Sequence, residues 1–348
     1  MSVRMRPAYR AIELYDPRRT PCALDLSDNT NLFGVAPSLV KLLEAPPTAL
    51  LTRYPPVFAD ELKQMLARRH RVEPENITTG CGSDDVIDSA MRAFCEPGDR
   101  VAYPIPTFGI VATFARMNAA EPAEVATNPD FSIEPDRLIA EGAAITYVCT
   151  PNNPTGLPVD ADVVRGLDER LDGVLLLDEA YADFGADDHA GFAAASQRTI
   201  SLRTMSKACG LAGLRVGYAI GPAALIREVE KSRGPYKVNA VADAAARGIL
   251  SADRAWVDDV VAQTRVNRTQ LAQRLRALGL TLWPSAANFI LVKLPAGRMA
   301  NEVNMALRAR GVAVRPFANL PHAGDCIRVT VGPWEMMEEF LTTLAAVL

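Results

Sequence analysis

Short aliphatic runs alternate with helical stretches through the middle of this chain. Strands are predicted at 100–103, 144–149 and 174–177, and helices at 110–117 and 161–170. Continuous apolar strands separated by helices are typical of a parallel sheet that is buried on both faces. Such sheets bind their ligands beyond the carboxyl ends of the strands. The pattern therefore predicts an α/β fold with a functional site along one edge of the sheet.

Three polar loops follow predicted strands and therefore meet at that edge. They cover residues 104–109, 151–156 and 178–181. In the first loop, Phe108 offers an aromatic face that could stack on a heteroaromatic ring. In the second, Asn153 is an amide donor within the proline-rich turn PNNPTG, suited to a phenolate oxygen on such a ring.

The third loop begins with Asp178, which ends a strand of aliphatic residues. A carboxylate there is costly unless a cation pairs with it, and a protonated pyridine nitrogen is such a cation. Tyr181, three residues later, could add a second donor to the phenolate. A structural salt bridge, or a cap on the next helix, is the alternative for Asp178.

The stretch TMSKACGLAGLRVG places Lys207 on a turn between two predicted strands. Thr204 and Ser206 precede this lysine, and Arg215 follows eight residues later. A lysine that forms a Schiff base is kept partly neutral by desolvation or by neighbouring cations. Hydroxyls and a guanidinium suit a phosphate on the same ligand. Both needs together describe pyridoxal phosphate, whereas a solvated surface lysine is the alternative.

A glycine turn, GCGSDD, follows the predicted strand 77–79 and opens a helix with apolar residues at helical spacing. Free backbone N–H groups at a helix start, at the positive end of its dipole, form a natural phosphate seat. Ser83 could equally be a plain helix N-cap.

Beyond residues 236–246 the pattern changes to a long predicted helix, 256–278, and then to mixed strands and helices. Arg315 and Arg328 both fall in predicted strands, where two arginines could clamp an anionic substrate group or remain solvated charges. We expect an N-terminal arm over 1–40, a large domain over 41–245 and a small C-terminal domain over 246–348.

Composition excludes several classes of protein. The formal charge of −4 gives no sign of a nucleic-acid surface. The basic amino terminus lacks the apolar run of a secretory signal, and the longest aliphatic run, 174–177, is too short to span a bilayer. Six scattered cysteines and three histidines argue against a disulfide frame or a metal centre. A cytoplasmic protein without metal, membrane or nucleic-acid partners is expected.

The ordered motifs RYP, GCGSDD, PTFG, PNNPTG, DEAYADF, TMSKACGLAGLRVG, PSAANFI and IRVTVG run nearly from end to end. With them the chain resembles the fold-type I pyridoxal phosphate enzymes, and most of all the histidinol-phosphate aminotransferase family. The resemblance implies an aspartate aminotransferase-like fold. Its large cofactor-binding domain has three layers around a mainly parallel sheet, and a smaller α+β domain follows.

The resemblance also implies roles for single residues. Lys207 carries the cofactor as a Schiff base and shuttles the substrate proton. Asp178 keeps the ring nitrogen protonated, which makes the ring an electron sink. Asn153 and Tyr181 hold the phenolic oxygen, and Phe108 stacks on the ring.

At the phosphate, the resemblance implies side chains of one turn and the main chain of another: Thr204, Ser206, Arg215, and Gly82, Ser83 and Asp84. Asp84 would act through its N–H, because its carboxylate would repel a phosphate. Tyr54 is expected to reach the phosphate of a partner subunit, which implies a homodimer with shared active sites. The substrate side would comprise Arg328, Arg315, Asn31 and Tyr15.

One departure concerns the substrate. Family members usually carry Asn-Glu-Asn-Pro where this chain has Asn29-Thr30-Asn31-Leu32, and that glutamate is expected near the substrate side chain. The resemblance implies an aminotransferase that exchanges an amino group between an amine or amino acid and 2-oxoglutarate. A decarboxylase similar to the threonine-phosphate enzyme, and a non-catalytic cofactor sensor, are the alternatives.

Overall fold

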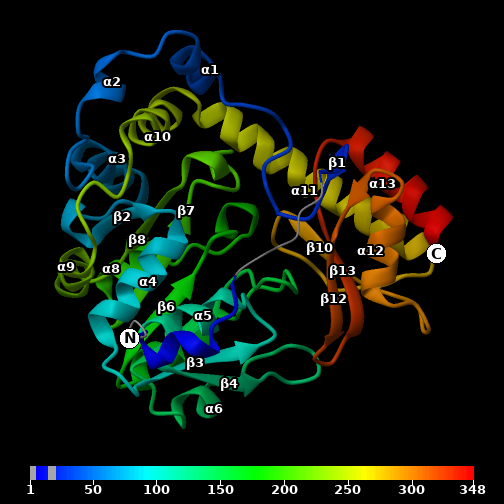
Figure 1. Ribbon diagram of the computed structural model, residues 1–348, viewed down its shortest axis with the longest axis horizontal. Helices are drawn as coiled ribbons and strands as arrows, with labels where there is room; N and C mark the ends of the chain where they lie inside the picture. The colour runs from blue at the N-terminus through cyan, green and yellow to red at the C-terminus, as the bar shows by residue number, and fades with distance from the viewer. Residues whose placement is uncertain (1–4, 15–20) are drawn as a thin grey trace.

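The computed structural model describes residues 5–14 and 21–348 and has a seven-stranded sheet at its centre (Figure 1). In spatial order its strands are β2 (Ile77–Cys81), β8 (Val216–Ile220), β7 (Thr199–Thr204), β6 (Val174–Asp178), β5 (Ile145–Cys149), β3 (Arg100–Ile105) and β4 (Glu121–Ala126). Every residue of β5 and β6 is buried. These aliphatic runs therefore form the middle of the sheet, as their composition predicted.

The sheet is mainly parallel, which confirms that prediction, but β8 runs antiparallel to both of its neighbours. The connection from β7 to β8 is short and contains only the 3₁₀ turn η4 (Ala212–Leu214). A parallel crossover needs a longer connection, usually with a helix. The carboxyl ends of β2, β3, β5, β6 and β7 consequently meet the start of β8 at one edge.

Helices cover both faces of this sheet, which gives the three expected layers (Figure 1). One face packs against α4 (Ser83–Phe94), α5 (Ile110–Met117) and α9 (Ala223–Ser232). The other packs against α6 (Pro135–Ile139), α7 (Ala161–Arg170), α3 (Asp60–His70), α8 (Ala190–Ala195) and α10 (Ala240–Ala252). The helices α1 (Pro37–Glu44) and α2 (Ala49–Thr52) lie against α10.

A second, four-stranded antiparallel sheet is formed by the C-terminal part of the chain. Its order is β12 (Arg315–Leu320), β13 (Gly324–Thr330), β10 (Phe289–Lys293) and β9 (Thr281–Leu282). It shares a hydrophobic core with the helices α11 (Arg254–Ala277), α12 (Ala300–Arg308) and α13 (Trp334–Val347). Figure 1 shows the long helix α11 reaching from the large sheet to this smaller one.

The described residues of the N-terminal arm form short elements that the sequence pattern did not predict. They include the 3₁₀ helix η1 (Pro7–Ala11) and the strand β1 (Leu24–Asp25), and α1 already begins at Pro37. β1 pairs in parallel with β11 (Val312–Ala313) of the C-terminal part. Leu24 and Leu26 are buried in the hydrophobic core around the smaller sheet, so burial against distant residues orders a segment that lacks a local period.

Other elements were missed or bounded differently in the sequence analysis. The edge strand β4 has the burial pattern of a half-exposed strand, and its glutamates and proline gave no apolar run. Arg315 lies in a strand as predicted, where it is the first residue of β12, and the short strand β11 ends two residues earlier at Ala313. In the part of the chain that the structure describes, no helix is long and apolar enough to cross a membrane.

Candidate functional site

A cavity of about 620 Å³ opens at the sheet edge where the strands end. That volume lies within the range of small-molecule and cofactor pockets. It is lined by twelve of the residues that the sequence analysis selected: Ser83, Asp84, Phe108, Asn153, Asp178, Tyr181, Thr204, Ser206, Lys207, Arg215, Arg315 and Arg328. The residues from 83 to 215 meet because the ends of the parallel strands and the start of β8 lie at one edge, and Arg315 and Arg328 reach the same cavity from the smaller sheet.

Lys207 lies in the turn between β7 and β8, and its side chain is directed toward the N-terminal segment. Its Nζ donates a 3.3 Å hydrogen bond to the main-chain oxygen of Asp28 and lies 5.6 Å from the centre of the Tyr181 ring. Burial, and next the positive charge of Arg328, lower the pKa of Lys207 to about 8. A substantial share of this amine is therefore neutral near physiological pH.

Asp178 is buried at the end of β6. Its Oδ2 accepts a 2.6 Å hydrogen bond from the hydroxyl of Tyr147, and its Oδ1 accepts one of 3.0 Å from the N–H of Ala180. Burial raises the pKa of Asp178 to about 6, although these two hydrogen bonds oppose that rise. No lysine or arginine of the described residues forms an ion pair with it, so its carboxylate faces the cavity with capacity for a further donor.

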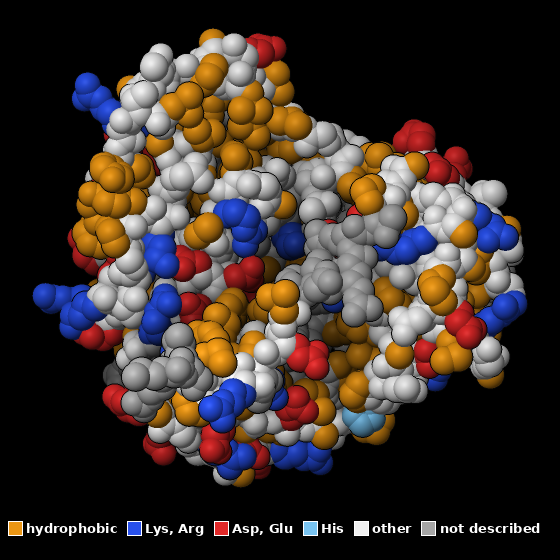
Figure 2. All heavy atoms as spheres, viewed as in Figure 1, with side chains coloured by type: hydrophobic (Ala, Val, Ile, Leu, Met, Phe, Trp, Pro, Cys, Tyr) orange, Lys and Arg blue, Asp and Glu red, His pale blue; other side chains and the backbone are white. Residues whose placement is uncertain are grey.

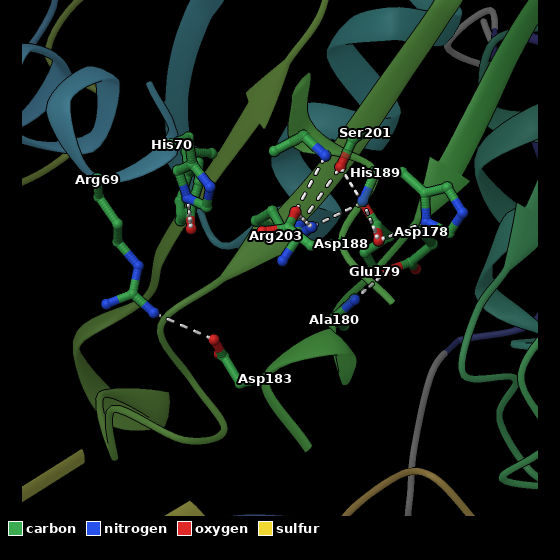
Figure 3. A network of polar contacts seen from close by, with 12 residues as sticks. Arg69, His70, Asp178, Glu179, Ala180, Asp183, Asp188, His189, Ser201 and Arg203 are labelled. Carbon is green, nitrogen blue, oxygen red and sulfur yellow. Dashed lines mark hydrogen bonds and ion pairs between the residues drawn. The ribbon is translucent and has the colours of Figure 1, made fainter. Parts of the chain in front are cut away.

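The next carboxylate, Glu179, belongs to a different network on the other side of the strand end (Figure 3). It accepts hydrogen bonds from Ser201 at 2.5 Å, Arg203 at 2.9 Å and His189 Nδ1 at 3.0 Å. Arg203 also pairs with Asp188 at 2.6 Å. Burial acts to raise the pKa of Glu179, but Arg203 and these hydrogen bonds lower it overall. The structural salt bridge considered for Asp178 is thus made by its neighbour.

Tyr181 and Asn153 on the cavity wall each accept a hydrogen bond from another residue, which leaves their own donor groups available. Asn29 Nδ2 donates a 3.0 Å hydrogen bond to the hydroxyl oxygen of Tyr181, so the hydroxyl proton of Tyr181 remains available to the cavity. Arg328 Nη1 donates to Asn153 Oδ1 at 2.5 Å, which leaves the amide N–H₂ of Asn153 as its donor. Both groups can therefore donate to an oxygen of a bound ring.

Hydroxyls and a guanidinium gather at the start of α4. Thr204 Oγ1 donates to Ser206 Oγ at 3.0 Å, and Arg215 Nη1 lies 3.5 Å from the same oxygen. Arg215 also pairs with the carboxylate of Asp84 at 3.1 Å. Gly217 of β8 allows the turn before α4 to lie close to that strand, because a Cβ at position 217 would lie 2.1 Å from the carbonyl carbon of Gly82. The donors and the helix start suit an anion.

The two strand arginines lie directly opposite each other, since Arg315 and Arg328 are partners in the register of β12 and β13. Arg328 is buried, donates to Ser27 O at 2.6 Å and lies 5.3 Å from the Phe289 ring centre. Arg315 is half-buried and lines the cavity. Together they make the smaller-sheet side of the cavity positive.

Three selected residues do not line the cavity, and a fourth lies outside the described part of the chain. Asn31 donates instead to the main-chain oxygen of Ala208 at 3.0 Å. Tyr54 is 83% exposed and stacks on Tyr236 at 4.8 Å between ring centres. Gly82 is the N-cap of α4, directly beside Arg215. Tyr15 is not among the described residues.

Sequence reasoning missed Asn29 and Tyr147, which contact the cavity residues Tyr181 and Asp178. Asn29 has a positive φ of 55°, a conformation in which asparagine is enriched, and its place in the turn cluster SDNTNLFG was a usable signal. Tyr147 stands within an apolar strand, and nothing local distinguishes it from a core residue.

The described residues contain no cluster of side chains that could hold a metal ion. The cavity fits an organic cofactor with three polar groups instead. It offers an anion seat at Ser206 and Arg215, a carboxylate at Asp178 for a protonated nitrogen, and a partly neutral amine at Lys207 for a carbonyl carbon. Phe108 supplies an aromatic wall.

Comparison with known proteins identifies the family of this chain. The family model "Aminotransferase class I and II" matches residues 23–344. "Histidinol-phosphate aminotransferase 1" of Nostoc sp. is 32% identical over 326 residues, which cover 93% of this chain and 91% of that protein. A crystal structure of histidinol-phosphate aminotransferase from Sinorhizobium meliloti, in complex with pyridoxal-5'-phosphate, matches with a TM-score of 0.88 and 25% identity over 100% of this chain and 98% of that one.

L-threonine-O-3-phosphate decarboxylase from Porphyromonas gingivalis also matches, with a TM-score of 0.80 and 24% identity over 93% of this chain and 98% of that one. At that identity the likeness concerns the fold alone. The matches to solved structures confirm the fold that the sequence resemblance implied.

Proposed function

Because this chain belongs to the class I and II aminotransferases, and within them to the histidinol-phosphate aminotransferase family, we propose that it transfers the amino group of a phosphorylated amine of the histidinol phosphate type to 2-oxoglutarate. It is a pyridoxal phosphate-dependent transaminase. Bound pyridoxal phosphate supplies an electron sink for the carbon that carries the amine. The residues of the cavity bind that cofactor and move the proton.

One observation carries the residue assignments. Lys207 is partly neutral and lines the same cavity as the anion seat of Ser206 and Arg215 and the buried carboxylate of Asp178. A surface lysine has neither the lowered pKa nor such neighbours. This supports Lys207 as the residue that binds the cofactor covalently and then uses its Nζ to carry the substrate proton.

The remaining assignments follow the donors described above. Ser83, Thr204, Ser206 and Arg215, with the main-chain N–H groups of Gly82 to Asp84, bind the phosphate. The Asp84 carboxylate pairs with Arg215, which supports a main-chain role for Asp84 at the phosphate. Asn153 and Tyr181 donate to the phenolic oxygen, Asp178 accepts from the ring nitrogen, and Phe108 stacks on the ring.

The substrate's anion is assigned to Arg315 and Arg328. Their positions opposite each other on β12 and β13 allow two guanidinium groups to approach one carboxylate or phosphate. Thr30 stands where the family usually carries a glutamate, so recognition of the imidazole end has to come from other residues. We assign the cavity residue Asp28 to that side, beside Lys207, and keep Asn31 and Tyr15 as further candidates.

We further propose that the active unit is a homodimer in which Tyr54 reaches the partner's phosphate. Tyr54 is 83% exposed and does not line the cavity of its own chain. Figure 2 shows hydrophobic side chains gathered over the region of α1 and α2, and the exposed ones near there include Val35, Leu43, Leu51, Phe58 and Tyr236. Burial of such a patch favours association.

Unpaired cysteines throughout the described chain fit our assignment of the protein to the reducing cytoplasm.

The positions of the two sheets in the chain support a division into an arm (1–40), a large domain (41–245) and a small domain (246–348). The large sheet lies wholly within the second segment, and the four-stranded sheet lies within the third. β1 of the arm pairs with β11 of the third segment, so the arm would stabilise the small domain.

Single-turnover measurements test the proposed reaction. The loaded enzyme is mixed separately with histidinol phosphate, glutamate, phenylalanine and threonine phosphate, and the carbonyl products and carbon dioxide are quantified. Carbonyl products from histidinol phosphate and from glutamate support the proposal. Carbonyl product from glutamate but not from histidinol phosphate would refute the substrate and redirect the search to other amines. Carbon dioxide released from threonine phosphate, with the amine retained, would establish the decarboxylase instead.

Mixed dimers test the shared site. A Tyr54→Ala chain and a Lys207→Ala chain are each weakly active or inactive as pure dimers. If Tyr54 serves its partner, each co-refolded heterodimer has one complete site and one site that lacks both residues. The complete site combines the Lys207 of the Tyr54→Ala chain with the Tyr54 of the Lys207→Ala chain, so activity should return. Absence of recovery would contradict a shared site.

A further inference from the structure

Tyr147, in the middle of β5, has no part in the assignments above. Its side chain is fully buried, and its hydroxyl donates a 2.6 Å hydrogen bond to Oδ2 of Asp178. The carboxylate that accepts this hydrogen bond lines the cavity. A buried phenol is costly without a partner, yet an apolar side chain of similar size would have filled this core position without that cost.

We propose that Tyr147 is a positioning residue, which keeps the Asp178 carboxylate ionised and oriented toward the ring nitrogen of the cofactor. This inference rests on the proposed role of Asp178. It goes further by assigning the tuning of that carboxylate to a residue that lines no part of the cavity.

The geometry fixes both oxygens of the carboxylate. In the parallel register Tyr147 is the partner of Leu176, two residues before Asp178, so its side chain is on the same face of the sheet as the carboxylate. Tyr147 holds Oδ2 from the neighbouring strand, and the Ala180 N–H holds Oδ1 from the chain's own turn. Each oxygen keeps a lone pair for a donor in the cavity, while rotation of the carboxylate would break one of the two bonds.

Tyr147 opposes the neighbouring carboxylates in their effect on the pKa of Asp178. The groups that face it are Tyr147 and Cys149 from β5, Asp84 from α4, and Glu179 and Tyr181 from its own loop. Burial raises the pKa of Asp178, and the carboxylates of Asp84 and Glu179 raise it further. Among these five side chains, Tyr147 lowers it, because its hydrogen bond is made to the ionised form.

The test is the pH dependence of cofactor binding by apoenzyme, measured as the dissociation constant of pyridoxal phosphate for wild type, Tyr147→Phe and Tyr103→Phe. Tyr103 is a matched control, since it is a buried tyrosine of the same sheet whose hydroxyl bonds the remote Glu124 at 3.2 Å. The cofactor's own phosphate titrates near pH 6, but it does so equally for all three proteins. Differences between them therefore report on the protein.

We expect Tyr147→Phe to move the pH below which affinity falls upward by about one unit, and to weaken binding near that pH about tenfold, as the loss of one hydrogen bond to a charged group implies. Tyr103→Phe should match wild type. An unshifted profile for Tyr147→Phe, or an equal shift in both variants, would overturn the inference.

Two further proteins separate possible causes of failure. With Asp178→Asn present, adding Tyr147→Phe should change affinity no further, because Tyr147 acts through that carboxylate. If Asp178→Asn alone leaves the binding profile unchanged, the proposed role of Asp178 fails and not merely that of Tyr147. If Tyr147→Phe does not fold, 3-fluorotyrosine at position 147, a stronger donor of nearly the same shape, should move the profile to lower pH. An unshifted profile in that protein would contradict the inference.

Discussion

The side-chain amide of Asn29 donates a 3.0 Å hydrogen bond to the hydroxyl of Tyr181, 152 residues later in the chain. Asn29 is also bound on its main chain, because Asn288 donates to its carbonyl oxygen and its N–H donates to Thr330. One buried residue of the N-terminal segment thus connects the smaller sheet to a tyrosine of the cofactor cavity. The N-terminal segment is therefore part of the cavity wall.

Replacement of Asn29 by alanine should destabilise the protein by about 2 kcal/mol. The substitution removes the donor to Tyr181 and puts alanine at a left-handed φ of 55°. Asn319 is the control, because it has a similar φ of 52° but is exposed. Urea denaturation should show a distinctly smaller loss for Asn319→Ala, and equal losses in both variants would contradict the role of the buried hydrogen bond.

Glu179→Gln should reduce the free energy of unfolding by about 3 kcal/mol. It leaves the buried Arg203 with one carboxylate partner, Asp188, whose side chain is 62% exposed. The matched control is Glu228→Gln, which removes one partner of an exposed pair with Lys231 and should change stability by less than about 0.5 kcal/mol. Chemical denaturation at neutral pH compares the two. Similar small changes would show that the network in Figure 3 is not needed for stability.

The rate at which apoenzyme captures pyridoxal phosphate should rise with pH through a midpoint near 8. Burial and Arg328 lower the pKa of Lys207 to about 8, so its Nζ is protonated and unreactive below that pH and neutral above it. An unperturbed lysine would place the midpoint near 10.4. Stopped-flow absorbance gives the rates, and a midpoint above 10 would contradict the buried position of the amine.

Asp178→Ala should still bind the cofactor but lose activity by about 10²-fold or more, the scale seen when one electrostatic contact to a reacting group is removed. Without the carboxylate, nothing keeps the ring nitrogen protonated. Asp172→Ala, at an exposed position two residues before β6 begins, should retain wild-type kcat. Near-wild-type turnover of Asp178→Ala would refute the assignment.

Local patterns in the sequence predicted the elements that create the cavity. The aliphatic run of β6 and the turn residues of 151–156 carry their structure in neighbouring residues, so Asp178 and Asn153 could be expected at the same edge. The direction of β8 could also have been inferred, because the connection from Thr204 to Val216 leaves no room for a crossover helix.

Contacts between distant residues could not be predicted in this way. Tyr147 and Asp178 are 31 residues apart and meet only because β5 and β6 pair in a particular register. Leu24 and Leu26 have no local period, and their burial depends on β1 pairing with β11, almost 290 residues later. Such contacts follow from the tertiary arrangement, which propensity and periodicity do not specify.

The most direct test of the account is to locate the covalent attachment of the cofactor. Borohydride reduction of the loaded enzyme, followed by peptide mass mapping, should find the phosphopyridoxyl group on Lys207. Lys207→Ala should carry no such group and lose turnover, while it keeps part of its cofactor affinity through the other cavity contacts. A label on a different lysine, or unchanged transamination by Lys207→Ala, would contradict the central claim.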